Sequence, residues 1–246
     1  MRANIQFATA GQSGKVLLVT SPGPAEGKTT ILCNLAIAMA HTGKRVVVVD
    51  GDLRRPTVHR RFKLEKKEPG LSNFLADQEM ALSEVLHASQ LEGVSVVPGG
   101  LIPPNPSELL GSPRMADLLE QLADVADLVL VDSPPVLIVA DTPIIAAQLD
   151  GAIVVVDGFK TKKSSLRATL DSLYKTQINV LGVVLNKLKR ARFGYGYGYP
   201  HYYDYYYYQY TSNSDGDEAA ANGAGPVYKR PFVWVRSVFT RSGERS

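Results

Sequence analysis

A glycine followed by a lysine and two threonines gives this sequence its clearest candidate for phosphate chemistry. Gly27, Lys28, Thr29 and Thr30 lie in the stretch VTSPGPAEGKTT, directly after the apolar run 15–20. Where such a loop leads from a strand into a helix, backbone N–H groups cradle a polyphosphate, the lysine reaches its β/γ oxygens, and the first threonine hydroxyl ligates Mg²⁺. The stretch therefore predicts a site for ATP and Mg²⁺.

One position departs from the usual spacing of a phosphate-binding loop. Pro22 stands where the first glycine of that pattern is expected. A simple Gly/Pro turn before an ordinary helix is the alternative explanation of the same residues. The apolar run before the loop and the helical pattern after it are the setting that phosphate binding requires, so we favour the phosphate-binding loop.

Aspartates mark the ends of two further apolar runs. Asp50 and Asp52 occur in VVVVDGDLRRP, and Asp132 occurs in LVLVDSPP. Alternate carboxylates beyond a strand end can point into one pocket, where they support a metal ion and accept a proton. Asp132 has the placement of the carboxylate that holds Mg²⁺ in nucleotide hydrolases. The first two aspartates alone could form a solvated turn, but beside a phosphate-binding loop the three predict nucleotide hydrolysis or phosphoryl transfer.

The apolar pattern predicts the elements that bring these residues together. Short β-branched runs, several apolar on both faces, alternate with longer helical patterns, which is typical of a parallel sheet flanked by helices. Ligands of such α/β, P-loop NTPase-like folds bind at the carboxyl ends of the strands. We expect strands at 15–20, 44–50, 94–98, 127–132, 152–157 and 179–186, and helices near 29–42, 80–88, 107–123, 141–149 and 164–176.

Composition limits the function classes further. Of 246 residues, 45% are hydrophobic and 21% are charged, as in soluble globular domains. The net charge of +3 is too small to argue for nucleic acid. Cys33 is the only cysteine, so no intrachain disulfide is possible, and we expect a reducing cytosolic setting and a packing role for this thiol.

A fourth strand end offers a weaker candidate. Asn186 and Lys187 end the run GVVLNK, and a side-chain amide there could hydrogen-bond an adenine edge; a turn-forming asparagine explains the residue equally well. The basic stretch KTKKSS, 160–165, could contact phosphate, but surface lysines are usually only solvated, so we leave it out of the predicted site.

The C-terminal part has a different composition. The alternating pattern stops near residue 190, so we place a catalytic domain at 1–190 and a disordered tail at 191–246. Ten of the twelve tyrosines fall in the cluster 195–210, YGYGYPHYYDYYYYQY. A sticky low-complexity tail is one explanation; a tethered kinase substrate is the other. The cluster consists of Tyr195, Tyr197, Tyr199, Tyr202, Tyr203, Tyr205, Tyr206, Tyr207, Tyr208 and Tyr210.

These motifs together resemble the cytoplasmic kinase domain of bacterial tyrosine kinases, the BY-kinases that accompany capsule and exopolysaccharide export. SPGPAEGKTT resembles their Walker A motif, VVVVDGDLRRP their Walker A′ motif and LVLVDSPPVLIVADT their Walker B motif; PPNPSELL, 103–110, and the tyrosine cluster also match. The resemblance covers about residues 2–210. It implies an ATP-dependent protein-tyrosine kinase that phosphorylates its own C-terminal cluster and regulates polysaccharide synthesis and export.

Two other functions are open to the same fold. Septum-positioning and plasmid-partition ATPases share the sheet and the acidic strand ends, but they carry a signature lysine at the position of Gly23. A non-catalytic ATP-binding scaffold is the third possibility. The absence of that lysine, the tyrosine cluster and the Arg54-Arg55-Pro56 sequence favour the kinase.

The resemblance also implies roles for individual residues. Lys28 and Thr29 bind the ATP phosphates and Mg²⁺, Asp52 and Asp132 support the metal, and Asp50 accepts the tyrosine proton. Phosphoryl transfer depends mainly on positioning and charge stabilisation, which agrees with these roles. Arg54 or Arg55 could steady developing charge, but we rank both below the aspartates.

Partners follow from the resemblance as well. It implies a transmembrane activator (chain-length determinant) protein, a cognate tyrosine phosphatase, and a location in the cytoplasm at the inner face of the plasma membrane. Family members carry a Glu-x-x-Arg-x-x-Arg stretch that contacts the next subunit of a ring; Arg2 is the one residue of it that could be present here, so ring assembly is in doubt. Each phosphate adds about −1.5 to −2 charges, so we expect multiple phosphorylation to release the tail and loosen any ring.

Overall fold

The computed structural model describes residues 15–65, 68–188 and 233–235. The tyrosine cluster, the rest of the predicted tail, the N-terminal residues and 66–67 lie outside the described residues. The predicted boundary at residue 190 and the disorder of the tail therefore stay predictions. Within the described ranges, no helix is both long enough and apolar enough to cross a membrane.

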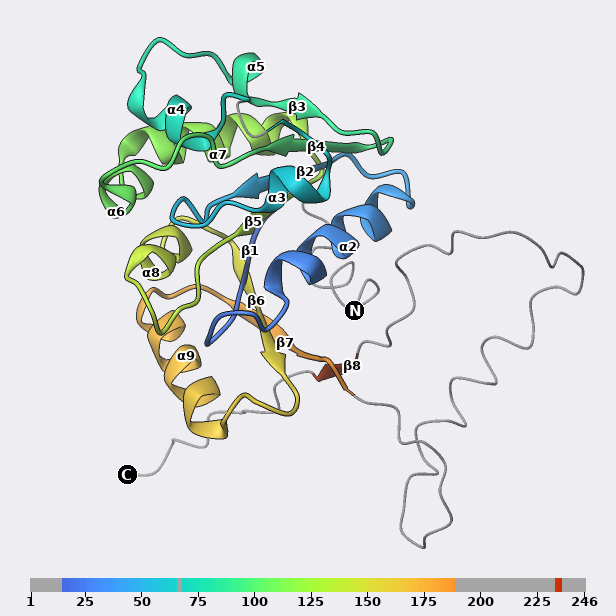
Figure 1. Ribbon diagram of the computed structural model, residues 1–246, viewed down its shortest axis with the longest axis vertical. Coiled ribbons are helices and arrows are strands. Elements are labelled where there is room, and N and C mark those ends of the chain that lie inside the picture. The colour runs from blue at the N-terminus through green and yellow to red at the C-terminus, as the bar shows by residue number, and fades with distance from the viewer. Residues whose placement is uncertain (1–14, 66–67, 189–232, 236–246) are drawn as a thin grey trace, which may run out of the picture. The chain divides into compact units, whose positions relative to one another are not determined.

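One mainly parallel sheet organises the described residues (Figure 1). Its strand order is β3-β4-β2-β5-β1-β6-β7-β8, and the six strands from β4 to β7 in that order run parallel. Both outer strands, β3 and β8, pair antiparallel with their neighbours. The bounds are Lys15–Thr20 for β1, Val46–Asp50 for β2, His87–Ala88 for β3, Val94–Val97 for β4, Leu128–Asp132 for β5, Gly151–Asp157 for β6, Val180–Asn186 for β7 and Val233–Val235 for β8.

Helices cover both faces of the sheet (Figure 1). One face carries α2, Lys28–Ala40, and the single-turn α3, Val58–Arg61, whose buried residues share a core with alternate strand residues such as Leu17 and Val19. The opposite face packs the remaining helices against Val16 and Leu18. These are α4, Leu71–Ala76; α5, Leu82–Val85; α6, Pro106–Leu110; α7, Pro113–Val125; α8, Asp141–Ala146; and α9, Lys163–Lys175.

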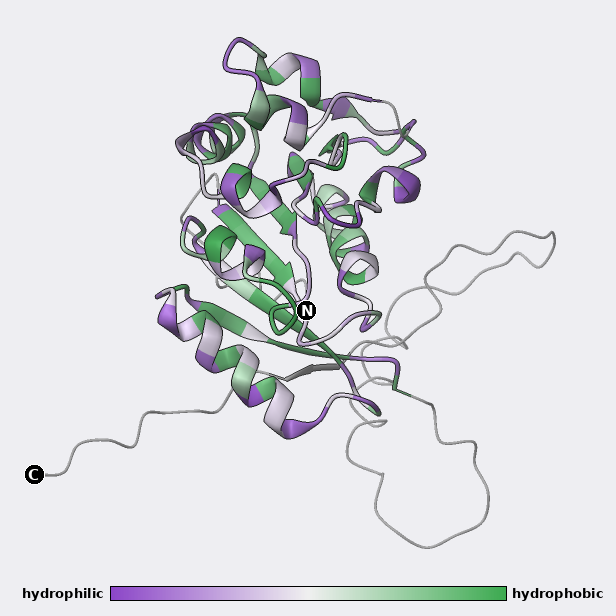
Figure 2. Cartoon of the chain, turned by 60° about the vertical axis from the view of Figure 1, so that its left-hand side comes forward, coloured by the Kyte–Doolittle hydropathy of each residue, from purple (hydrophilic) through white to green (hydrophobic). Residues whose placement is uncertain are grey.

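The central strands are buried from end to end. Every residue of β2, β5 and β6 is buried, and Figure 2 shows hydrophobic strands inside helices with polar outer surfaces. A parallel strand covered on both faces has no solvent side, which is why these runs are apolar without alternation. The sheet is therefore a rigid platform for the side chains at its carboxyl edge.

The predicted fold class is confirmed, with local corrections. The helix expected at 107–123 is two helices, α6 and α7, because Gly111 ends the first and Pro113 begins the second. The helix expected at 80–88 is only the short α5, followed by β3. The sequence analysis also missed α3, α4 and β8. Both helices are shorter than two turns and β8 has three residues, so none of them carries a periodic signal.

Candidate nucleotide-binding site

The carboxyl ends of three central strands bring the predicted residues together. Strand β5 lies between β2 and β1, and Asp132 at its end pairs in register with Asp50 of β2 and Val19 of β1. The phosphate-binding loop begins directly after β1 and leads into α2. Lys28, the first residue of α2, therefore lies beside Asp132 at the end of β5 and Asp52 just beyond the end of β2.

The loop ends in a glycine that no other residue could replace without strain. Gly27 has φ +99°, and a Cβ added to it would lie 2.2 Å from Nδ2 of Asn186. No side chain caps the N-terminus of α2, so the first N–H groups of the helix lack intrahelical acceptors. A helix start of this kind favours an anion such as a phosphate group.

Lys28 is the centre of a compact ionic cluster. Its Nζ lies 3.2 and 3.3 Å from the two carboxylate oxygens of Asp132, and 3.3 Å from Oδ2 of Asp52. The side chain of Asp132 is 0% exposed and that of Lys28 is 13% exposed. Burial alone would lower the pKa of Lys28, but the two carboxylates outweigh it and raise that pKa. Lys28 is therefore an ammonium cation held directly at the acidic strand ends.

Both threonines after Lys28 are hydrogen-bonded. Thr29 donates its hydroxyl to Oδ2 of Asp132 at 2.6 Å, and Thr30 accepts a hydrogen bond from Nη2 of Arg61 at 3.2 Å. Burial raises the pKa of Asp132, although Lys28 and Thr29 both act to lower it. A hydroxyl and two carboxylates thus lie within one small cluster, and hard oxygen ligands of this kind suit Mg²⁺.

Asp50 has a different environment from the other two aspartates. Its Oδ2 accepts hydrogen bonds from the backbone N–H groups of Thr57, at 2.8 Å, and Val58, at 2.9 Å, while its buried Oδ1 has no partner among the described residues. Burial, together with the nearby charge of Asp132, raises the pKa of Asp50 to about 7. A carboxylate with a pKa near neutrality and one unused oxygen can accept a proton at physiological pH.

Asn186 supports the phosphate-binding loop from the side of β7. Its Nδ2 donates to the carbonyl of Glu26 at 2.8 Å, and its Oδ1 accepts from the backbone N–H of Lys187 at 2.8 Å. The amide is 8% exposed and lies against Gly27. In this arrangement Asn186 fixes the loop backbone, so its predicted contact with an adenine edge stays a prediction.

The sequence analysis missed a second set of residues around the same loop. Glu26 is 8% exposed; its Oε1 accepts a hydrogen bond from Thr161 at 2.8 Å, and its buried Oε2 has no partner among the described residues. Burial raises the pKa of Glu26. Lys187 donates to the carbonyl of Ala25 and pairs with Asp157 at 3.0 Å. The available signals were that Asp157 ends the buried apolar run of β6 and that Lys187 directly follows β7.

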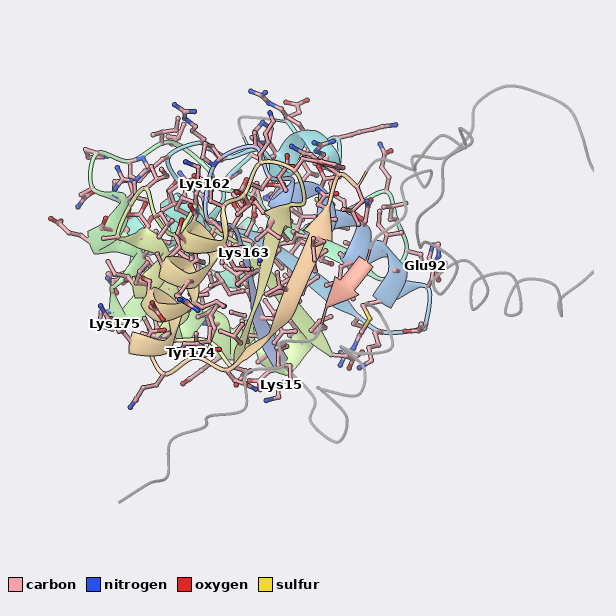
Figure 3. The ribbon with its side chains drawn as sticks, turned by 90° about the horizontal axis from the view of Figure 1, so that it is seen from below. Lys15, Glu92, Lys162, Lys163, Tyr174 and Lys175 are labelled. Atoms are coloured by element: carbon pink, nitrogen blue, oxygen red, sulfur yellow. The ribbon has the colours of Figure 1, made fainter. Side chains whose placement is uncertain are left out.

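In the basic stretch 160–165, the threonine contacts the phosphate-binding loop and the next two lysines do not. Thr161 contacts Glu26, whereas Lys162 and Lys163 are exposed. Figure 3 shows these two lysines at the start of α9, with Tyr174 and Lys175 at its other end. The exclusion of these lysines from the site stays a prediction.

Cys33 lies on the buried face of α2. It is 6% exposed, and burial raises the pKa of its thiol to about 12. A thiol with such a pKa is a poor nucleophile. The geometry is that of the packing role expected from the sequence.

The fold and the cluster define a class of protein. A loop ending in Gly27, Lys28 and Thr29 connects a central parallel strand to a helix N-terminus, and two acidic strand ends contact the lysine. This is the architecture of a P-loop nucleotide-binding domain.

Comparison with known proteins narrows the class to a family. Residues 17–194 match the family described as the CobQ/CobB/MinD/ParA nucleotide binding domain. The tyrosine-protein kinase YwqD of Bacillus subtilis (strain 168) is 37% identical over 192 residues, which cover 78% of this chain and 80% of the relative. The chain belongs to this nucleotide-binding family and, within it, to the bacterial protein-tyrosine kinases.

Two further comparisons set the extent of the match. The putative tyrosine-protein kinase EpsB of Ralstonia solanacearum is 39% identical over 188 residues, covering 76% of this chain but only 25% of that protein. The kinase domain of the Escherichia coli tyrosine kinase ETK superposes with a TM-score of 0.73 at 34% identity, covering 80% of this chain and 77% of that chain. The matched region is thus a kinase domain that also occurs inside a much longer protein.

The rival ATPase class resembles the chain less closely. The cell division ATPase MinD of Pyrococcus furiosus superposes with a TM-score of 0.60 at 25% identity, covering 70% of this chain and 71% of that chain. The sheet is common to both classes, so the preference for the kinase family rests on the tyrosine kinase relatives.

Proposed function

We propose that this kinase transfers the γ-phosphoryl group of Mg-ATP to tyrosines of its own C-terminal cluster, and so regulates the synthesis and export of capsular or extracellular polysaccharide. The observation that carries the proposal is the convergence of Lys28, Thr29, Asp52 and Asp132 around one point, with Asp50 on the adjacent strand end. Lys187 and Leu188, the last residues described before the cluster at 195–210, directly follow β7 at that same edge.

The side chains of the site fit a magnesium ion. Thr29, Asp52 and Asp132 offer a hydroxyl and two carboxylates within one hydrogen-bonded cluster, and Mg²⁺ takes a few protein oxygens beside substrate phosphates and water. Bound there, Mg²⁺ would neutralise part of the phosphate charge. The three residues are thus the proposed metal-binding set.

The residues of the chain have separate roles in the proposed reaction. Lys28 and the N-terminus of α2, with Gly27, Thr29 and Thr30, hold the phosphate oxygens, and Asn186 supports the loop that presents them. The bond between the γ-phosphorus and the ADP oxygen breaks, a bond to the tyrosine oxygen forms, and the tyrosine proton passes to Asp50. A tyrosine hydroxyl has a pKa near 10 and is neutral at pH 7, so an acceptor with a pKa of about 7 assists the attack.

The proposed substrate is supplied by the chain itself. Strand β7 ends at Asn186, beside the phosphate-binding loop, and Leu188 is the last residue described before the tyrosine cluster. A tethered substrate has an effective concentration in the millimolar range for a short flexible connection. Tethering therefore allows these tyrosines to be phosphorylated without a shaped substrate groove, in their own subunit or in a neighbour.

Intact-mass analysis after incubation with Mg-ATP tests the proposal. We expect stepwise additions of one phosphate, and their loss in Lys28→Met. Lys15→Met is the matched control, because Lys15 lies at the amino end of β1; this variant should keep the additions. ATP hydrolysis without protein phosphorylation would instead support a positioning ATPase, and nucleotide binding alone would support a scaffold.

A second pair of variants tests the substrate. Replacing the ten clustered tyrosines with phenylalanine should abolish the mass additions. Tyr174→Phe should leave them unchanged, because Tyr174 is 50% exposed on α9 but lies outside the cluster. Additions that persist in the ten-residue variant would place the phosphorylated tyrosines elsewhere.

The proposed setting is the inner face of the plasma membrane. There the kinase would act with a transmembrane activator and a tyrosine phosphatase, as the family resemblance implies; ring assembly stays a separate prediction. Flotation of the kinase with vesicles, in the presence and absence of the activator's cytoplasmic segment, tests this setting. Binding that is the same without the activator segment would contradict the activator as the anchor.

A further inference from the structure

An arginine, an aspartate and a serine form a closed cluster beside the phosphate site. Arg54 donates through Nε to Oδ2 of Asp141 at 2.7 Å and through Nη2 to Oδ1 at 3.0 Å. Ser107 donates its hydroxyl to Oδ1 of Asp141 at 2.5 Å, and it also accepts from Nη2 of Arg54 at 3.3 Å. A two-point contact between guanidinium and carboxylate fixes the direction of both side chains.

Burial makes this cluster more than a surface ion pair. The side chain of Asp141 is 0% exposed, whereas that of Arg54 is 42% exposed. Burial would raise the pKa of Asp141, but the hydrogen bonds from Arg54 and Ser107 outweigh it and hold the pKa below its usual value. A buried carboxylate without its partners is costly, so the three side chains stay together in the folded protein.

The cluster joins three separate segments of the chain. Arg54 lies in the loop after β2, Ser107 lies in α6 within the PPNPSELL stretch, and Asp141 begins α8 after β5. The reaction proposed above gives the PPNPSELL stretch no role. Through Ser107 it connects to the loop that carries Asp52, two residues before Arg54.

We propose that the Arg54–Asp141–Ser107 cluster is a positioning device that holds Asp52 in place for metal binding during phosphoryl transfer. The inference rests on the proposed function, because it assigns Asp52 to the metal. Arg54 itself does not reach the phosphates in this role. It acts through the backbone between Asp52 and itself, so it is a positioning residue.

The contacts of Asp52 itself show why such a device is needed. Its Oδ2 lies 3.3 Å from Nζ of Lys28, and its Oδ1 accepts from the backbone N–H of Arg55 at 3.1 Å. When Lys28 turns to the phosphate oxygens, Asp52 loses its ionic partner. Leu53, which is 0% exposed, and Arg54 then anchor the loop from its other side.

The two arginines of the stretch VVVVDGDLRRP have different surroundings. Arg54 is engaged by Asp141, whereas the side chain of Arg55 is exposed and has no partner within the described residues. Of the two arginines that the sequence suggested for stabilising developing charge, Arg54 is therefore assigned to positioning, and the role at the developing charge stays open to Arg55 alone. An engaged guanidinium cannot also follow a transferring phosphate without giving up two hydrogen bonds.

Kinetics of the full chain, with variants at each member of the cluster, test the inference. Arg54→Lys keeps the charge but loses the two-point contact, and should lower kcat about tenfold, the equivalent of one charge-assisted hydrogen bond. Asp141→Asn removes the carboxylate and should lower kcat by about 10²-fold, as expected for a displaced catalytic group. Ser107→Ala keeps the ion pair and should have the smallest effect of the three.

The Mg²⁺ requirement distinguishes positioning from a merely structural role, because a structural role would leave it unchanged. We expect the Mg²⁺ concentration for half-maximal rate to rise about tenfold in Arg54→Lys, while affinity for ADP without Mg²⁺ stays within about twofold of the parent. Equal losses of ADP affinity with and without Mg²⁺ would overturn the inference, because they would indicate damage to the whole loop.

Arg45→Ala is the matched control. Arg45 also pairs with an aspartate, Asp127, with 3.1 Å between Nη2 and Oδ1, but at the amino ends of the strands. This variant should keep the parent kcat and Mg²⁺ requirement. Thermal unfolding of every variant identifies any that fails to fold, and the milder Ser107→Ala and Arg54→Lys then carry the test.

The outcomes separate this inference from the proposed function. A parent chain that never phosphorylates tyrosine contradicts the proposed function, and the Mg²⁺ dependence of ADP binding still tests the cluster. An active parent whose cluster variants keep both kcat and the Mg²⁺ requirement contradicts the cluster alone.

Discussion

The two ends of strands β2 and β5 use the same kinds of residue in opposite ways. At the amino ends, Arg45 and Asp127 pair on the surface, with side chains 64% and 33% exposed. At the carboxyl ends, Asp50 and Asp132 are 0% exposed, and Asp132 meets Lys28. One pair of strands thus carries a solvated ion pair at one edge and a buried ionic site at the other.

The contrast appears in the acidity of the aspartates. Hydrogen bonds from the side chain and backbone of Arg45 lower the pKa of Asp127, whereas burial and Asp132 raise the pKa of Asp50 to about 7. Water screens the exposed pair and limits its energetic effect. Each edge pairs an aspartate with a basic residue, but the charges become chemically useful at the edge where water is excluded.

The largest expected effect is the loss of Asp132. Asp132→Asn removes a charge that contacts both Lys28 and Thr29, and we expect tyrosine phosphorylation to fall by at least about 10²–10³-fold, the usual loss for one electrostatic contact in an active site. Asp127→Asn, at the other end of β5, should leave the rate unchanged. The measurement is the initial rate of phosphate incorporation. Similar losses from both variants would mean that the two edges do not differ in function.

Two glycines with positive φ, one at each edge of the sheet, differ in the space around them. Gly27→Ala would place a Cβ 2.2 Å from Nδ2 of Asn186, whereas Gly43, with φ +82°, has nothing within 4 Å. Both substitutions incur about 1–2 kcal/mol of backbone strain, but only Gly27→Ala also deforms the phosphate-binding loop. We expect ADP affinity, measured by calorimetry, to fall at least about tenfold in Gly27→Ala, at an added cost above 1.4 kcal/mol. Gly43→Ala should lose stability without losing affinity.

The pH dependence of stability should have opposite signs at the two edges. The pKa of Asp50 rises from 3.8 to about 7 on folding, so between these values the native state keeps a proton that the unfolded state has released. Stability from Asp50 therefore falls as pH rises through this window. The lowered pKa of Asp127 gives the reverse: its contribution is present above the unfolded value of 3.8 and is lost as pH falls below it.

Urea unfolding of the nucleotide-free protein in a chelator tests these signs. Asp50→Asn should flatten the decline between pH 4 and 7, and Asp127→Asn should not. Phosphorylation by the parent chain should rise with pH as Asp50 loses its proton. A decline that survives in Asp50→Asn would assign the titration to another group.

The smallest expected effect is the loss of the exposed pair. Arg45→Ala should lower the free energy of unfolding by no more than about 1 kcal/mol, since the guanidinium is 64% exposed. Added salt should reduce the difference between variant and parent, because it screens exposed charges. If chemical denaturation shows a larger loss of unfolding free energy that salt does not change, the Arg45–Asp127 pair is not a solvent-screened pair.

Much of the fold was predictable because its signals are local. The β-branched runs that form β2, β5 and β6 are apolar on both faces, and each stops at an aspartate. Since parallel strands end at one edge, the meeting of Lys28 with Asp52 and Asp132 followed from their positions in the chain. The catalytic roles of these residues stay proposals.

The contacts between distant segments were not predictable from local pattern. Arg54 and Asp141 are 87 residues apart in the chain, and Glu26 and Thr161 are 135 apart; neither pair has a characteristic spacing. The environment of Asp50 also depends on Gly99, where an added Cβ would lie 3.7 Å from the carboxyl carbon of Asp50; no sequence motif records this approach. Such features require the packed structure, because they result from loops of different strands that converge at one edge.

Lys187 fastens the phosphate-binding loop to the end of β7. It donates to the carbonyl of Ala25, pairs with Asp157, and is followed by Leu188, the last residue described before the tyrosine cluster. Asn186, the residue before Lys187, also donates to the loop, at the carbonyl of Glu26. One lysine side chain therefore ties the backbone of the nucleotide loop to the point where the described domain ends.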